Sequence, residues 1–152
     1  MLDKLLLPER IILDMKAKTK EEAIRELLDA AGIPEDKKPV VFDALMKRES
    51  IGSTGIGKGI AIPHTRSIVL DKVYLVVGRS KEGVDFDALD GKPVHLFFLL
   101  CAPPQDIGTT YLVLLGKIAQ IARKLTKTQD YMNIESPEEF RDYLLKIYQE
   151  NE

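Results

Sequence analysis

The spacing of hydrophobic residues divides the chain into short apolar strands and longer segments with helical periodicity. An apolar stretch at Arg10–Met15 predicts a first strand. Thr19 and Glu22 have the spacing of a capping box and predict the start of a helix. Gly32 is expected to end that helix. The residues expected on its buried face are Ala23, Ile24, Leu27, Leu28 and Ala31.

A second helix is predicted over Lys38–Arg48. The residues expected on its buried face are Val40, Val41, Ala44 and Leu45. Arg48 lies three residues after Leu45 and continues the same stripe to the helix end. A cation there often binds the last carbonyl groups of its helix, so Arg48 has a structural interpretation as well as a functional one.

Three further strands are predicted at Gly59–Pro63, Lys72–Gly78 and Val94–Cys101. The last is apolar on both of its alternating faces, which is typical of a central strand covered on both sides. A helix is expected from about Ile107 or Gly108 to Leu125. Strands interleaved with helices predict an α/β layered fold.

The last helix is expected to begin at Ser136, which is followed by a proline and two acidic residues. The residues expected on its buried face are Phe140, Tyr143, Leu144 and Ile147. With 152 residues, the chain suits a single domain spanning residues 1–152.

Charge and composition then narrow the function classes. The net charge is −2, too small for a general attraction to nucleic acid or an acidic membrane surface. No apolar run is long enough to cross a bilayer, and the N-terminal residues do not resemble a signal peptide. The single cysteine, Cys101, excludes an internal disulfide. These features predict a cytoplasmic protein without direct membrane insertion that works with soluble partners.

The segment IGSTGIGKGIAIPHTRS, residues 51–67, has the most unusual composition. It matches most of a nucleotide-binding P-loop, but Gly59 stands where that loop needs a hydroxyl group for magnesium. A P-loop also runs from a strand into a helix, whereas here a predicted helix precedes the loop and a strand follows it. The sequence therefore disfavours a nucleoside triphosphate site.

Four glycines in this segment have two interpretations. They form a turn with positive φ angles, or they let a partner approach the backbone closely. We favour approach at Gly55 and Gly57, so that Gly57→Val should block a partner while leaving the melting temperature nearly unchanged.

His64 follows the glycines, at the predicted end of a strand and next to Pro63. Three interpretations of His64 are considered: an ordinary surface residue, a metal ligand and a nucleophile. A metal site would need companions, and His95 and Cys101 lack ligand-like spacing to it, so no metal is expected. A neutral imidazole nitrogen can instead accept a phosphoryl group near pH 7. Arg48 is the candidate cation for the phosphoryl oxygens.

Two longer segments, KRESIGSTGIGKGIAIPHTRS and DGKPVHLFFLLCAPP, carry a specific resemblance. They resemble the enzyme IIA family, mannitol/fructose type, of the bacterial phosphoenolpyruvate:sugar phosphotransferase system. The resemblance implies a mixed β-sheet covered by helices on both faces, and no cofactor. It implies that His64 accepts a phosphoryl group from the phosphocarrier protein HPr and that Arg48 is the active-site arginine.

The segment GSTGIG most resembles the nitrogen-regulatory branch of that family, in which the phosphorylation state controls target proteins. Further candidates for phosphate or partner contact are Ser53, Thr54, Gly55, Gly57 and Tyr111. Tyr111 stands where the family often has a second histidine, and it is either a hydrogen-bond donor to phosphate or a packing residue. His95 is expected to be structural.

Three functions remain open at this point. The first is a phosphohistidine carrier with a regulatory output. The second is a sugar-specific IIA component that passes phosphate to a separate IIB chain. The third is an interaction module that has kept the fold and lost phosphotransfer.

Overall fold

A mixed β-sheet organises the part of the chain that the computed structural model describes, residues 2–104 and 110–150. The helices are α1 Leu2–Leu5, η1 Pro8–Arg10, α2 Lys20–Asp29, η2 Glu35–Lys37, α3 Lys38–Ile51, α4 Thr110–Thr128, η3 Asp130–Asn133 and α5 Pro137–Glu150. The strands are β1 Ile11–Ile12, β2 Gly55–Gly57, β3 Ile60–Ala61, β4 His64–Arg66, β5 Tyr74–Val84 and β6 Val94–Ala102.

The strand order is β1-β5-β6-β3-β2, and β4 also pairs with β6. β5 and β6 are antiparallel, with Val77 opposite Phe98. On the other side of β6, β3 and β4 run one after the other, both parallel to it. The sheet is therefore mixed, as the resemblance implies, and β6 is its central strand.

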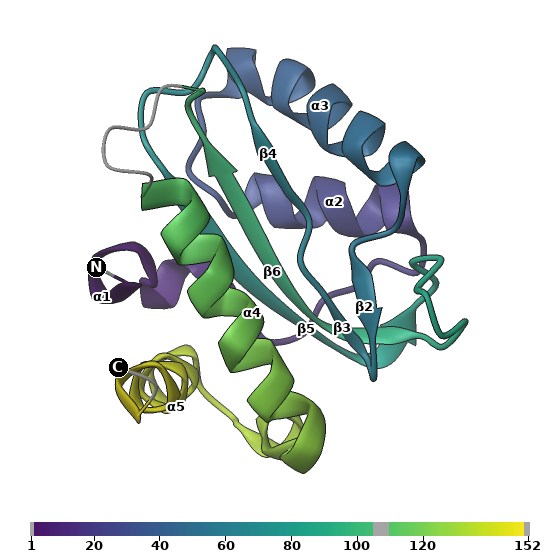
Figure 1. The fold of residues 1–152 in the computed structure, drawn as a ribbon, viewed down its shortest axis with the longest axis vertical. Helices are drawn as coiled ribbons and strands as arrows, with labels where there is room; N and C mark the ends of the chain where they lie inside the picture. The colour runs from purple at the N-terminus through teal and green to yellow at the C-terminus, as the bar shows by residue number, and fades with distance from the viewer. Residues whose placement is uncertain (1, 105–109, 151–152) are drawn as a thin grey trace.

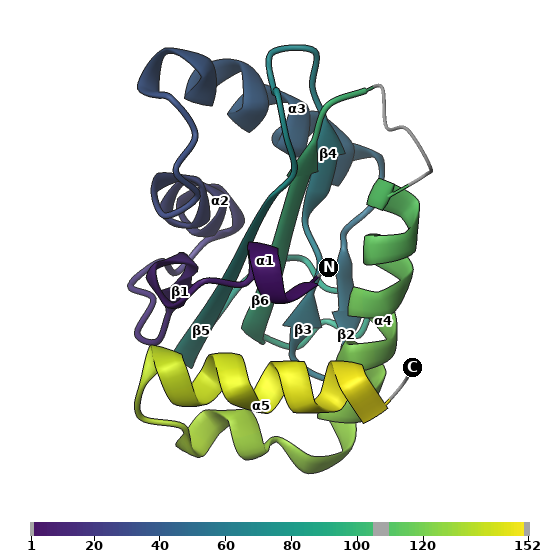
Figure 2. The same cartoon turned by 90° about the vertical axis from the view of Figure 1, so that its left-hand side faces the viewer.

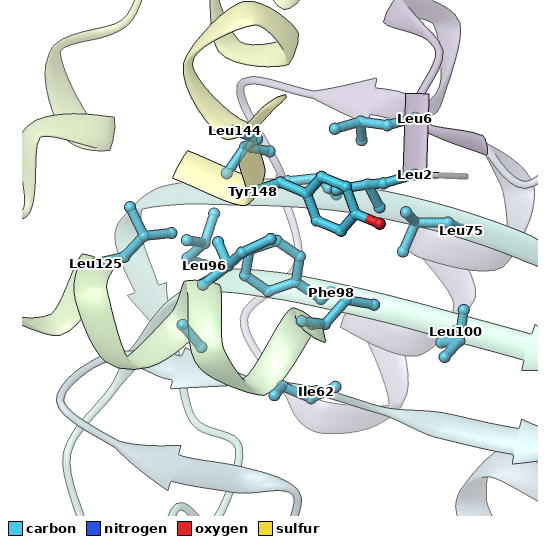
Figure 3. Close-up of a cluster of buried hydrophobic side chains, with 14 of the residues drawn as sticks. Leu2, Leu6, Ile62, Leu75, Leu96, Phe98, Leu100, Leu125, Leu144 and Tyr148 are labelled. Atoms are coloured by element: carbon cyan, nitrogen blue, oxygen red, sulfur yellow. The ribbon is translucent and has the colours of Figure 1, made fainter. Parts of the chain in front are cut away.

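Helices cover both faces of this sheet (Figures 1 and 2). On one face, α4, α5 and α1 pack against Leu96, Phe98 and Leu100 of β6. Figure 3 shows side chains of α1 and α5, among them Leu2 and Leu144, over this part of the sheet. On the opposite face, α2 and α3 cover the alternate residues of β6. The α/β fold with helices on both faces is therefore confirmed.

Several local predictions are also confirmed. Thr19 and Glu22 form a complete capping box at the start of α2. The helix ends earlier than predicted, at Asp29 with Ala30 as its C-cap, and Gly32 lies in the following turn with a φ of +80°. At α5, the Ser136 hydroxyl accepts a hydrogen bond from the amide of Glu139. The predicted start of the helix before Leu125 lies outside the described residues.

Other boundaries differ from the prediction. β1 contains only two of the six predicted residues. After it, the Met15 amide still donates to the Arg79 carbonyl of β5 at 2.9 Å, but the neighbouring backbone groups bind side chains. The amides of Lys16 and Ala17 donate to the Glu26 carboxylate, and the Leu13 carbonyl accepts from Arg79. In the second helix, Val41 and Leu45 are buried as predicted, but Val40 is exposed.

Arg79 is a charged residue inside the core that the sequence pattern did not predict. Its side chain is 2% exposed. Its guanidinium donates to the carbonyl oxygens of Leu13 at 3.1 Å, Tyr131 at 2.7 Å and Ile134 at 2.5 Å. Burial lowers the pKa of Arg79, but an arginine side chain stays charged in proteins. Arg79 therefore ties the segment before α2 and the segment before α5 to β5.

We expect Arg79→Ala to lower the free energy of unfolding by roughly 3–5 kcal/mol, because the change removes three charge-assisted hydrogen bonds and leaves carbonyl groups unsatisfied. Urea denaturation followed by circular dichroism measures the change. Arg123→Ala, on the exposed side of α4, is the control and should shift stability by no more than about 0.5 kcal/mol. Equal effects of the two changes would contradict a structural role for Arg79.

Candidate functional site

His64 is the first residue of β4, which pairs with β6 so that His64 lies opposite Leu100. The sequence predicted one strand that ends at Pro63. In the structure β3 ends at Ala61 and a new strand begins at His64. Pro63 has no N–H to donate, yet its carbonyl accepts from the Leu100 amide at 3.0 Å, so the pairing with β6 continues past the proline.

The His64 ring is half-buried and held in one orientation. Its Nδ1 lies 2.7 Å from the carbonyl oxygen of Ile62. A carbonyl oxygen can only accept, so in this hydrogen bond Nδ1 carries the proton. In the neutral ring, the lone pair is therefore on Nε2. In this tautomer Nε2 is the nitrogen that can act as a nucleophile.

Tyr111, in the first turn of α4, lies beside this ring. The two ring centres are 6.5 Å apart, at an angle of 50°. On the tyrosine ring lies the guanidinium of Arg66, 4.5 Å from its centre. Burial raises the pKa of Tyr111 to about 12, while the positive charges of Arg66 and Arg48 act in the opposite direction. The phenol is therefore protonated near neutral pH and can donate a hydrogen bond.

Arg48 lies near the end of α3, which packs against β4. Its Nη1 donates to the carbonyl oxygen of Gly52, the residue that caps α3, at 2.8 Å. The structural interpretation of Arg48 as a cation at the helix end is therefore correct. This bond uses one of its five N–H donors. The positive charge of Arg48 also acts to lower the pKa of Tyr111.

A buried polar brace, which the sequence analysis missed, fixes the segment before His64. Glu49 is buried, and its carboxylate accepts from the amide of Thr54 at 3.1 Å and from the Thr54 hydroxyl. The Lys20 ammonium lies 3.2 Å from the same carboxylate. The Thr54 carbonyl in turn accepts from the Ile62 amide at 3.0 Å. The brace thus fixes Ile62, whose own carbonyl orients His64.

The sequence did contain a signal for Glu49. It lies four residues after Leu45 on the buried stripe of its helix, where a carboxylate needs a partner. The Ser53 hydroxyl is also used within the fold, since it donates to the Phe86 carbonyl and accepts from the Gly55 amide, both at 3.0 Å. The hydroxyl groups of Ser53 and Thr54 therefore both make hydrogen bonds within the protein.

Gly55 and Gly57 are required by the fold itself. A Cβ atom on Gly55 would lie 2.8 Å from the Cβ of Ala88. Gly57 has a φ of +98°, which L side chains rarely adopt. The expectation that Gly57→Val leaves stability unchanged is therefore wrong. Lys58 and Gly59, at +55° and +86°, form the two-residue turn between β2 and β3.

The other sequence interpretations have simple outcomes. The glycine segment follows α3 and leads into a hairpin, an arrangement unlike that of a P-loop. His95 uses Nδ1 to bond the Ser80 carbonyl at 2.8 Å. In residues 2–104 and 110–150, no three His, Cys, Asp or Glu side chains gather closely enough to hold a metal ion.

Comparison with known proteins identifies the family of this chain. Residues 4–147 match the family described as "Phosphoenolpyruvate-dependent sugar phosphotransferase system, EIIA 2". This chain belongs to the EIIA type 2 family. The predicted resemblance is therefore confirmed.

Relatives of this EIIA type 2 chain have two kinds of name. A "Nitrogen regulatory protein" of Bradyrhizobium diazoefficiens is 37% identical, over 87% of this chain and 90% of the relative. A "PTS system fructose-specific EIIABC component" of Bacillus subtilis is 35% identical over 93% of this chain, which corresponds to 22% of that longer protein.

Solved structures share the fold of this EIIA type 2 chain. The crystal structure of the nitrogen regulatory protein IIA-Ntr from Neisseria meningitidis has a TM-score of 0.80 and 33% identity, over 94% of this chain and 98% of that one. Enzyme IIAMtl, in a complex with phosphorylated enzyme IIBMtl from Escherichia coli, has a TM-score of 0.72 and 22% identity, over 93% and 97%. Of the helices in the described residues of this chain, none has the length and apolar character needed to span a bilayer.

We expect Gly57→Ala to lower the free energy of unfolding by about 1 kcal/mol, because alanine is strained at its positive φ. Gly52→Ala is the matched control. Its φ is 174°, an extended conformation open to any residue, and a Cβ would meet no atom within 4 Å. This second change should be neutral or stabilise the protein by up to about 1 kcal/mol. Thermal unfolding of both variants measures the difference, and an opposite ranking would refute the argument from φ.

Proposed function

We propose that the chain is a phosphohistidine carrier that accepts a phosphoryl group on Nε2 of His64 from an HPr-type phosphocarrier protein. The single observation that carries the proposal is the hydrogen bond from Nδ1 of His64 to the Ile62 carbonyl. It leaves the lone pair on Nε2 in a half-buried ring beside Tyr111, on whose own ring the Arg66 guanidinium lies.

The transfer balances without an added acid or base. The Nε2 lone pair attacks the phosphorus atom of the donor's phosphohistidine, and the donor P–N bond breaks, with its electron pair returning to the donor ring. The proton on Nδ1 of His64 stays in place during this step. Its hydrogen bond to the Ile62 carbonyl stabilises the positive charge that develops on the phosphorylated ring.

Arg48 and Tyr111 serve as stabilising groups in this proposal. A loose phosphoryl transition state carries its charge on three oxygen atoms, and guanidinium groups stabilise that charge. Arg48 has N–H donors left after its bond to Gly52. The protonated phenol of Tyr111 lies beside the imidazole ring, in the place of the family's second histidine.

Apolar side chains around the site suit docking of a partner protein. Ile68 is 86% exposed and Leu112 is 57% exposed, and each lies within two residues of Arg66 or Tyr111. Ile51, at the end of α3, and Val113 are exposed as well. We assign this surface, Ile51, Ile68, Leu112 and Val113, to the phosphocarrier and to the next protein in the relay, such as a IIB component.

Among the possible outputs, regulation of target proteins is our first proposal. It is supported by the match to nitrogen regulatory proteins over most of both chains. A sugar-specific IIA role is the second candidate, supported by the match to a fructose-specific component. Phosphate transfer to a purified fructose-type IIB chain distinguishes them: rapid transfer favours the sugar role.

We also propose a cytoplasmic location, for which the single buried cysteine is the support.

The proposal is tested by incubation with phosphoenolpyruvate, enzyme I and HPr, followed by phosphorus NMR under alkaline conditions. We expect one phosphoryl group per chain on Nε2 of His64 and none in His64→Ala. His95→Gln is the control and should be labelled like the parent. Label on His95 or on Nδ1 of His64 would refute the proposed geometry, and absence of label would favour an interaction module without phosphotransfer.

We expect Arg48→Ala to slow phosphorylation by at least roughly a hundredfold, since a transition-state arginine contributes several kcal/mol. Its stability should fall by only about 0.3–1 kcal/mol, the contribution of a cation at a helix end. Rapid-quench phosphorylation and thermal unfolding of the same samples measure both quantities. If the variant is phosphorylated at the normal rate and shows the same small loss of stability, Arg48 has only a structural role, through its bond with Gly52.

We expect Leu112→Glu to raise the KM for phosphorylated HPr about tenfold, as for loss of a central interface contact of 1–2 kcal/mol. Phosphorylation by phosphoramidate, a small donor, should be unchanged, because it needs no docking surface. Leu89→Glu, an exposed leucine outside this surface, is the matched control and should leave both reactions unchanged. Loss of the phosphoramidate reaction in Leu112→Glu would point to damage at His64 instead.

A further inference from the structure

A cleft lies at the C-terminal end of α4, and Figure 1 shows that this end of the helix is at the opposite end of the sheet from the start of α4. It is a cleft of about 510 Å³ between the β2–β3 turn, the start of β6 and the C-terminal end of α4. Tyr111 and Thr126 are both on α4, and the rise of a helix separates them by about 22 Å. Because of this separation, the cleft shares none of the groups placed around His64.

Two cations line this cleft without a carboxylate partner. Lys58 is in the β2–β3 turn and Lys92 precedes β6, and both are exposed. Within the described part of the chain, neither ammonium group has a carboxylate oxygen within 4.0 Å. The cleft therefore offers positive charge to a ligand.

One carboxylate, Asp90, also lines the cleft, but backbone groups already bind it. Its oxygens accept from the amide of Lys58 at 2.9 Å and from the amide of Lys92 at 3.0 Å. The same two bonds lower the pKa of Asp90. The carboxylate thus holds the backbone of the two lysines in place on the wall of the cleft.

Tyr131 gives a second, independent indication of a ligand. Its side chain is 2% exposed, yet it lines the cleft. The hydroxyl lies beside Gly59, 3.7 Å from the position of a Cβ on that residue, and makes no hydrogen bond within the described residues. Burial raises the pKa of Tyr131, so the hydroxyl stays protonated and can donate. Since no buried side-chain oxygen in the described residues lacks a hydrogen-bond partner, this hydroxyl is not sealed in the core and is open to the cleft that Tyr131 lines.

The remaining lining is polar enough for a hydroxylated molecule. His95 bonds the Ser80 carbonyl through Nδ1, which leaves Nε2 as an acceptor in the neutral ring. Gln129 and Thr126 add an amide and a hydroxyl group from the end of α4. The volume exceeds that of a single phosphate ion and falls in the usual range for small-molecule sites.

We propose that this cleft binds the phosphate monoester of a small polyhydroxylated metabolite, of sugar phosphate size. Lys58 and Lys92 bind the phosphate dianion, because lysine is a common point-charge partner of phosphate. The hydroxyl of Tyr131, with Gln129 and His95, binds the hydroxyl groups of the ligand. This binding goes beyond the proposed phosphoryl transfer, since none of these groups takes part in it.

Nitrogen-15 NMR titration with glucose 6-phosphate tests the proposal in a form that does not depend on phosphoryl transfer. We expect saturable shifts of the amides around Lys58, Lys92 and Gln129 in the parent and equally in His64→Ala. Glucose, which lacks the phosphate, should produce no saturable shift. Inorganic phosphate should bind more weakly, because it cannot reach Tyr131 and the lysines together.

Variants then identify the groups. Lys58→Asn removes the charge and keeps a residue that tolerates the positive φ at this position, and Lys92→Ala removes the second charge. Each should weaken binding of glucose 6-phosphate roughly three- to tenfold, as should Tyr131→Phe, which keeps the buried ring. Lys47→Ala, an exposed lysine on α3, is the matched control and should bind like the parent.

Three results would overturn the proposal. The first is shifts confined to the surroundings of His64, or no saturable shift at millimolar ligand. The second is equal binding by the parent, Lys58→Asn and Lys92→Ala. The third is equal affinity for inorganic phosphate and glucose 6-phosphate, which would rule out a contribution from the hydroxylated body. A loss of phosphorylation at His64 with unchanged shifts would count against the proposed function alone.

Discussion

Burial of β6 on both of its faces is the constraint on which the rest of the structure depends. Its alternate side chains enter two separate apolar clusters, one under α4 and α5 and the other under α2 and α3. A strand enclosed in this way must also satisfy its backbone groups on both edges. β5 does so on one edge, and the two short strands β3 and β4 do so on the other.

This requirement explains why a proline can stand beside the phosphoryl acceptor that we propose. Pro63 interrupts the donor side of the pairing, but its carbonyl still accepts from β6. Ile62 instead directs its backbone away from β6, where its amide donates to Thr54 and its carbonyl accepts from the ring of His64. Pairing with β6 and orientation of the imidazole ring thus use different backbone groups of the same segment.

Two features fix the glycine segment: the contacts of the buried Glu49 carboxylate and the backbone conformation of Gly57. Glu49 joins Lys20 on α2 to Thr54, and Thr54 bonds Ile62. Gly57 is needed because of its positive φ. Much of the conspicuous composition of this segment therefore belongs to the support of the site. Tyr111, beside the imidazole ring, comes from α4, and Arg66, on the tyrosine ring, comes from β4.

The sequence by itself determined the order of the main strands and helices, the central strand, the caps of α2 and α5 and the family. These features depend on local spacing, on capping residues and on one long motif, all of which are visible along the chain. It could not place Arg79 in the core or separate β3 from β4, because those outcomes depend on partners 52 or more residues away and on a carbonyl at Pro63. Only the tertiary structure decided the roles of Ser53, Thr54 and Glu49, and it brought Tyr111 to His64. The physical reason is that hydrogen bonds and charges act between neighbours in space, whereas hydrophobic periodicity records only which face of each element is buried.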